Sequence, residues 1–206
     1  MKETIKENQI NENLLEEMLE EKNLRAALKR VVSNKGSPGV DGMTVVELPK
    51  YLKTNWLSIK ENLLTGKYKP APVKRVEIPK PNGGVRQLGI PTVVDRFIQQ
   101  ALMQVMQRKW DKTFSENSFG FRPNCSAHQA ITKAKQYVKR GNGWVVDIDL
   151  EKFFDKVNHD RLMSKCAERI SDVRVLKLIS SYLKVGVLLN GIVSPSSEGT
   201  MTAMFI

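Results

Sequence analysis

Two aspartates two residues apart are the side chains in this sequence best suited to chemistry. Asp147 and Asp149 lie in the run Trp144-Val-Val-Asp-Ile-Asp149, whose β-branched and apolar residues predict a buried strand. Side chains two positions apart in a strand share a face, so both carboxylates are expected on one face. Buried carboxylates need compensation, and hard oxygen ligands suit Mg²⁺. A solvated strand end without a metal is the alternative, and these residues alone leave both interpretations open.

The residues that follow carry a longer motif. Asp149-Leu-Glu-Lys-Phe-Phe-Asp155, continued by Lys-Val-Asn-His159, resembles the first catalytic motif of reverse transcriptases. The resemblance is closest to the bacterial group II intron reverse transcriptases, or maturases, and extends over roughly residues 14 to 200. It implies an α/β (α+β) fold of fingers and palm. It also implies an RNA-directed DNA polymerase of a mobile element that uses two Mg²⁺ ions.

The resemblance implies roles for the residues around the motif. Asp149 matches the catalytic, metal-binding carboxylate, and Leu150 is expected beside it at the metal site. Asp147 precedes the metal position, so we expect it to point into the base of the palm. Phe154 matches the gate that excludes ribose 2′-hydroxyls. Nucleotide contacts are implied for Leu150, Lys152, Phe153 and Phe154.

The composition favours a polyanionic partner. Lys and Arg number 33 against 22 Asp and Glu, for a net charge of +11. This balance favours nucleic acid over an acidic membrane surface, with simple solubility as the alternative. The charged N-terminus and the lack of an 18-residue apolar run predict a cytoplasmic protein that does not enter a membrane. Cys125 and Cys166 form no CxxC pair, which argues against structural zinc.

A basic hairpin is expected over residues 73–90. Arg75 to Lys80 alternates like an edge strand, Asn82-Gly83-Gly84 is a strong turn signal, and Val85 to Ile90 reads as the returning strand. The hairpin follows a stretch rich in lysine and proline, which keeps the chain extended.

Two cations flank the tip of this hairpin. Lys80 and Arg86 could hold a triphosphate, arginine through paired hydrogen bonds and lysine as a point charge. A solvated basic hairpin is the alternative. The run from Ile78 to Pro91 resembles the fingers motif of the same family, in which the matching Lys and Arg hold the phosphates of the incoming nucleotide.

Template contacts are expected elsewhere. The loop 34–42 holds three glycines and a proline, and its backbone amides beside Lys35 could bind phosphate, with a plain connector as the alternative. In the resembling family this loop lies on the RNA template. Phe114 to Pro123 resembles a further family motif, whose aromatics and arginine could stack on bases, with core packing as the alternative for Phe119 and Phe121. The expected template residues are Asn34, Lys35, Lys74, Arg75 and Arg122.

Helices should position these motifs. Apolar spacing predicts helices over residues 14–19, 24–32, 48–64, 92–110, 127–139, 159–164 and 173–183, and a short hairpin over 187–193. Asn23 is expected to cap the second helix and Thr92 the fourth, where Asp95 suits the first turn. Arg96 is expected to form a structural ion pair, and His159 a cap or local hydrogen bond.

The resemblance divides the chain into three parts. They are an N-terminal helical extension (1–33), fingers (34–140) and a palm (141–206). After Thr200 the family's Pro-Gln-Gly-Gly and Tyr-Ala-Asp-Asp motifs are not found, so we expect a palm that is truncated and catalytically incomplete.

Other readings stay open, and several partners are implied. The chain could be a non-catalytic RNA-binding module, or the reverse transcriptase of a retron or diversity-generating element. Expected partners are a group II intron RNA or other RNA template, a DNA primer and deoxynucleotide triphosphates. Self-association through the exposed palm strand is also expected.

Overall fold

The fold is a body of helices with a small β-sheet at one end. A computed structural model of the chain describes residues 13–79, 81, 83–189, 192–194 and 199. The helices are α1 (Leu14–Met18), α2 (Glu21–Ser33), α3 (Leu48–Leu64), α4 (Val93–Trp110), α5 (Ala127–Lys139), α6 (His159–Ala167) and α7 (Val173–Lys184), with 3₁₀ turns η2 (Asp111–Thr113) and η3 (Phe154–Lys156). The strands are β1 (Val73–Pro79), β2 (Val85–Ile90), β3 (Val187–Leu189) and β4 (Ile192–Ser194).

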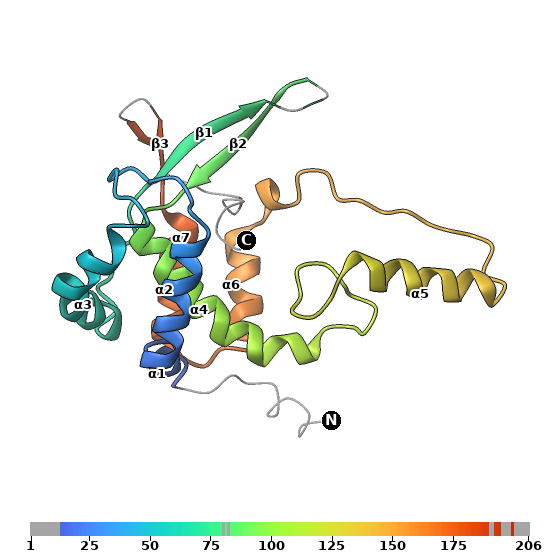
Figure 1. Ribbon diagram of the computed structural model, residues 1–206, viewed down its shortest axis with the longest axis horizontal. Coiled ribbons are helices and arrows are strands. Elements are labelled where there is room, and N and C mark those ends of the chain that lie inside the picture. The colour runs from blue at the N-terminus through green and yellow to red at the C-terminus, as the bar shows by residue number, and fades with distance from the viewer. Residues whose placement is uncertain (1–12, 80, 82, 190–191, 195–198, 200–206) are drawn as a thin grey trace.

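Helix α4 is the centre of the body and confirms the clearest helix prediction. The Thr92 hydroxyl caps it by accepting a hydrogen bond from the Asp95 amide at 3.1 Å. Its apolar side chains recur at helical spacing, and α1 and α2 pack against them (Figure 1). On another face, Phe97 meets Trp56 of α3 edge to face with ring centroids 5.7 Å apart.

The prediction for Asn23 is wrong. Helix α2 begins at Glu21, two residues before Asn23, so Asn23 lies inside the helix, where it is 6% exposed. Its side-chain amide donates to the carbonyls of Met18 and Ala101, both at 2.9 Å. The side chain therefore joins α2 to α1 and α4, because a buried amide needs partners wherever tertiary packing offers them.

The two predicted hairpins are present and join into one sheet. The strand order is β2-β1-β3-β4, and β1 pairs antiparallel with β2. Val73 of β1 pairs with Val187 of β3 in parallel, a contact that the sequence pattern did not predict. A Cβ at Gly186 would lie 2.8 Å from the Ser194 carbonyl oxygen, so glycine allows the close approach of β4.

Residues 114–153 form an extension from the body, which we call the arm. Helix α5 lies in it at some distance from the other helices, and a long connection returns from α5 to η3 (Figure 1). Helix α5 buries none of its side chains. It begins with a reciprocal capping box between Ser126 and Gln129, so local hydrogen bonds define its start.

The strand predicted over Val145–Asp149 is not formed. The segment runs as extended chain, and its side chains are open: Trp144 is 96% exposed, Val146 81% and Ile148 79%. A strand needs hydrogen-bond partners on a neighbouring strand, and none of the described strands pairs with this segment. The strand propensity of these residues is therefore not enough to form a strand, because no described strand pairs with the segment.

Among the described residues, no helix combines the length and the hydropathy needed to cross a membrane.

Candidate functional site

The basic hairpin predicted over residues 73–90 is present as β1 and β2. Its register pairs Ile78 with Arg86 close to the tip. Lys80 lies outside the described residues, and only the backbone of Arg86 is described. The triphosphate clamp predicted for Lys80 and Arg86 therefore stays a prediction.

A buried carboxylate joins the base of the hairpin to the helical body. Asp95, in the first turn of α4, is 1% exposed. Its Oδ1 accepts hydrogen bonds from the hydroxyls of Tyr68 at 2.8 Å and Tyr182 at 3.1 Å. Its Oδ2 accepts from the Ala71 amide at 3.1 Å and the Thr92 hydroxyl at 2.7 Å. These partners lie before β1, after β2 and on α7, so one side chain fixes both ends of the hairpin.

Burial governs the ionisation of this network. It raises the pKa of Asp95 above the ordinary value, an effect that the hydrogen bonds from Thr92 and Tyr68 only partly offset. Burial and the adjacent carboxylate also raise the pKa of Tyr68 and Tyr182, so both phenols stay protonated donors. The sequence pattern placed Asp95 only in a first helical turn. Partners that come from three separate segments leave no local signal.

Both aspartates of the predicted catalytic strand are exposed. Asp147 and Asp149 lie on the extended segment of the arm. The expectation that Asp147 points into the base of the palm is wrong for this structure, because no sheet forms there to bury it. Asp149 is accessible to a ligand from solvent.

The predicted nucleotide contacts form a turn directly after Asp149. Lys152 adopts a φ of 52°, and the Asp155 amide donates to its carbonyl at 3.0 Å. The rings of Phe153 and Phe154 meet edge to face with centroids 5.4 Å apart. Leu150, Phe153 and Phe154 are 64%, 53% and 52% exposed. The chain thus gathers these side chains at one accessible turn.

His159 ties this turn to a distant part of the chain. Its ring is buried, and Nε2 lies 2.7 Å from the carbonyl oxygen of Gly199. The Gly199 amide donates to the Val157 carbonyl at 2.9 Å. The capping role belongs to Asn158, whose Oδ1 accepts from the Arg161 amide at 2.9 Å. The predicted hydrogen bond of His159 is therefore long-range and not local.

The predicted template residues come from separate segments of the chain. Asn34 and Lys35 are exposed at the end of α2, where Lys35 has a φ of 48°. On β1, Lys74 is exposed and Arg75 half-buried.

Arg122 joins the arm to η2 through its guanidinium. Nε and Nη2 donate to the Asp111 carboxylate at 2.9 and 3.2 Å. Nη1 donates to the carbonyls of Ser115 and Ser118 at 2.8 and 2.9 Å. The pair lowers the pKa of Asp111 and raises that of Arg122. Arg122 therefore shapes the loop 114–122 from within, a role that the sequence motif did not show.

The family of this chain follows from its hairpin and its aspartate motif together. A family profile described as "Reverse transcriptase (RNA-dependent DNA polymerase)" matches residues 78–202, well over half of the sequence. The chain belongs to the reverse transcriptase family. The match begins on β1 and runs through the Asp149 turn, which confirms the family suggested by the two motifs.

Relatives of this reverse transcriptase chain include proteins named for introns, one of them for a group II intron. The chain is 39% identical over 183 residues to Protein YkfC of Escherichia coli. This match covers 85% of the chain and 48% of the relative. It is 32% identical over 175 residues to the Group II intron-encoded protein LtrA of Lactococcus lactis, covering 84% of the chain and 29% of LtrA. A yeast protein, Putative COX1/OXI3 intron 1 protein, is 33% identical, and the match covers 87% of the chain and 21% of that protein. The chain thus spans half or less of the length of these relatives.

A solved structure supports the fold. The chain superposes on part of a "Cas6-RT-Cas1--Cas2 complex" with a TM-score of 0.60, covering 92% of this chain and 20% of that one. The sequences are 18% identical, so this likeness concerns the fold alone. It confirms the predicted α/β reverse transcriptase fold.

Reverse transcriptases use divalent metal ions, so the carboxylates must be tested for fit. Within the described ranges, no three His, Cys, Asp or Glu side chains lie together as a metal site. Asp149 and the carbonyl of Leu150 can supply oxygen ligands, but a two-metal site requires further carboxylates. The described residues by themselves do not fit a two-metal centre.

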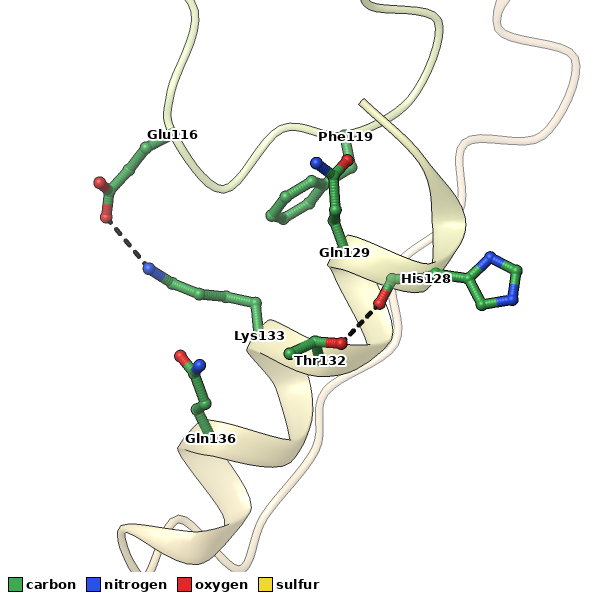
Figure 2. Close-up of a pocket in the computed structure, with 7 residues that line it drawn as sticks. All are labelled: Glu116, Phe119, His128, Gln129, Thr132, Lys133 and Gln136. Atoms are coloured by element: carbon green, nitrogen blue, oxygen red, sulfur yellow. Dashed lines mark hydrogen bonds and ion pairs between the residues drawn. The ribbon is translucent and has the colours of Figure 1, made fainter. Parts of the chain in front are cut away.

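A pocket of about 420 Å³ lies elsewhere, between α5 and the loop before it. Figure 2 shows Lys133 reaching toward Glu116 while the His128 ring points away from Phe119. The ion pair measures 3.4 Å between Nζ and Oε1. None of the predicted catalytic or nucleotide-binding residues lines this pocket. It is therefore separate from the Asp149 turn.

Proposed function

We propose that this chain provides the fingers and the start of the palm of an RNA-directed DNA polymerase of the group II intron type. One observation carries the proposal: the family match spans both the basic hairpin and the Asp149 turn. The relative named as a group II intron-encoded protein supports the lineage, and a yeast relative is also named for an intron. The proposed parts are the helical extension (1–33), the fingers (34–140) and the palm (141–206).

Asp149 is the proposed catalytic carboxylate and a ligand of Mg²⁺, with the Leu150 carbonyl beside it. The exposure of this segment supports the role, because a substrate can reach it from solvent. Lys152, Phe153 and Phe154 would contact the incoming deoxynucleotide. The aromatic rings at the turn offer a firm surface against the sugar, which suits Phe154 as the gate against the ribose 2′-hydroxyl.

The hairpin is the proposed phosphate-binding element. Lys80 and Arg86 would bind the triphosphate of the nucleotide through charge-assisted hydrogen bonds. The pairing of Ile78 with Arg86 supports this, since it sets position 86 close to the hairpin tip. Asp95 would hold the hairpin at the angle that the nucleotide requires.

The proposed macromolecular ligand is RNA, as an intron or a template, with a DNA primer. Asn34, Lys35, Lys74 and Arg75 are the proposed RNA contacts outside the arm, and Arg122 would act from within it. The net charge of +11 supports a polyanionic ligand. The described part of the chain holds no cluster of three carboxylates. This favours a second candidate function, RNA binding without catalysis by this chain.

Primer extension separates the two candidates. The assay uses an RNA template, Mg²⁺ and all four deoxynucleotides, with this chain and with the same chain joined to a Tyr-Ala-Asp-Asp palm hairpin and thumb. We expect extension by the joined protein. Asp149→Asn should lower its rate at least about a hundredfold, because a metal supplies several kcal/mol of charge stabilisation.

The matched control is Asp147→Asn, which removes another exposed carboxylate two residues away and should leave the rate within about twofold. Equal losses in both variants would contradict the role of Asp149. A joined protein that binds RNA but never extends the primer would favour the non-catalytic candidate.

A further inference from the structure

The loop 34–42 is fastened to the start of α4 by one arginine. Nη2 of Arg96 donates to the Ser37 carbonyl at 2.6 Å, across 59 positions of sequence. A Cβ at Gly36 would lie 2.3 Å from Nη1 of the same guanidinium. The guanidinium therefore occupies the space that any side chain at position 36 would need. The structural ion pair predicted for Arg96 is wrong, because this acceptor is a backbone carbonyl.

A second glycine brings the loop against the backbone. A Cβ at Gly39 would lie 2.7 Å from the nitrogen of Thr92 and 2.8 Å from the carbonyl oxygen of Pro91. These atoms belong to the junction between β2 and α4 and cannot rotate away. Residues 36–39 thus lie directly on the junction that also ends the hairpin, as the course of the chain beside β2 shows (Figure 1).

The guanidinium of Arg96 lies partly buried under this loop. Burial lowers the pKa of Arg96, while the nearby Asp41 carboxylate opposes that effect. Its Nε is enclosed and has no hydrogen-bond partner in the described part of the chain. Arginine stays charged in such settings. Nη2 donates to the Ser37 carbonyl and Nη1 lies under Gly36, so this geometry serves to hold the loop.

We propose that Arg96 is a positioning residue for RNA binding: it holds the loop 34–42 on the hairpin junction so that Asn34 and Lys35 face the RNA backbone. The proposal rests on the proposed function, because it assumes an RNA ligand. Both of these residues are exposed, and the adjoining residues 36–39 are fixed. A loop that is ordered before binding loses less conformational entropy when it contacts a phosphate.

Substitutions at two positions test the geometry without relying on charge alone. Arg96→Gln removes both the charge and the guanidinium, and Arg96→Lys removes the guanidinium but keeps the charge. Gly36→Ala keeps both but displaces the guanidinium. Arg108→Gln is the charge-matched control, at an exposed position on the same helix. Gly143→Ala is the control for the glycine, since an added Cβ there meets nothing within 4 Å.

Limited trypsin digestion of the full chain without RNA measures how accessible the loop 34–42 is to cleavage. We expect the bond after Lys35 to be cleaved about five- to tenfold faster in all three test variants, because a protease needs a locally released segment. The two controls should match the unsubstituted chain, and thermal melting should show that every variant is folded. Unchanged cleavage in folded Gly36→Ala and Arg96→Gln would overturn the proposal.

The dissociation constant for a labelled hairpin RNA then tests whether the position of the loop affects RNA binding. The dissociation constant should rise about fivefold in Arg96→Lys and Gly36→Ala, although neither changes the net charge. It should rise less in Arg108→Gln than in Arg96→Gln. Faster cleavage with unchanged RNA affinity would overturn the positioning role. If the unsubstituted chain fails to bind RNA, the proposed function falls and the role of Arg96 in RNA binding falls with it, while the trypsin result still describes the loop.

Discussion

Helices α4 and α5 have similar local signals and opposite environments. Each begins at a residue whose side chain caps the first turn, Thr92 in α4 and Ser126 in α5. Helix α4 then buries nine of its side chains, with α1 and α2 packed against it, whereas α5 buries none. The comparison shows that capping sets where a helix begins, while tertiary packing sets how much the helix contributes to stability.

Two isoleucines test this contrast with the largest expected effect. Ile98 on α4 is 1% exposed and Ile131 on α5 is 53% exposed. Ile98→Ala should lower the free energy of unfolding by about 3–4 kcal/mol, since it leaves a cavity in the core. Ile131→Ala should change it by less than about 0.5 kcal/mol. Urea denaturation measures both, and similar losses would mean that the arm packs more tightly than described.

Asp95 makes a prediction about pH. Burial raises its folded pKa above the ordinary value near 3.8, so its contribution to stability is full below that value and declines as the pH rises toward the folded pKa. In that window the free energy of unfolding should fall by up to about 1.4 kcal/mol per pH unit relative to Asp95→Asn. Denaturation of both proteins between pH 4 and pH 7 gives this difference. A difference that grows in the opposite direction with pH would show that the carboxylate is stabilised when charged.

The capping box of α5 predicts a smaller and local effect. Ser126→Ala should weaken the helix by about 1 kcal/mol, because it leaves the Gln129 amide without its side-chain acceptor. Amide exchange of residues 127–139 should become about fivefold faster, with the global unfolding midpoint unchanged. Thr132→Ala is a control inside the same helix. A global loss of stability in Ser126→Ala would tie α5 to the body.

The exposed arm segment predicts the smallest effect on folding. The side chains of Trp144, Val146 and Ile148 form an apolar surface that invites self-association. Trp144→Ser with Ile148→Thr should leave the unfolding free energy within about 0.5 kcal/mol. Light scattering over a concentration series should show less association in the double variant. A concentration-independent monomer before substitution would remove this role of the segment.

Local patterns predicted the elements well and the contacts between them poorly. The bounds of α5, the start of α4 and the two hairpins were all predictable, because caps, turns and periodicity act within a few residues. The prediction of a strand at Val145–Asp149 was wrong, because a strand depends on a neighbouring strand and not on local residues alone. The network of Asp95 and the hydrogen bond from Arg96 to Ser37 join distant segments, so the sequence pattern held no sign of either.

The same distinction applies to the candidate site. The motif around Asp149 was recognisable from residue types and spacing, and the family match confirms the family to which it belongs. The hydrogen bonds of Arg122 within the protein could not be recognised in the same way, because a motif shows which residue is present and not where its donors point. Residue roles at the site thus stay proposals that rest on resemblance and accessibility.

The central claim is that RNA contacts the hairpin, and that the basic residues at the end of α5 take no part in binding. Two adjacent Lys-Arg pairs allow a matched test, Lys74-Arg75 on β1 and Lys139-Arg140 at the end of α5. Filter binding of a structured RNA across a salt series measures affinity and the number of phosphate contacts. Alanine at Lys74 and Arg75 should lower affinity and reduce the salt slope by about 1.5, whereas alanine at Lys139 and Arg140 should change neither. Equal losses from both pairs, or a loss only from the arm pair, would contradict the account.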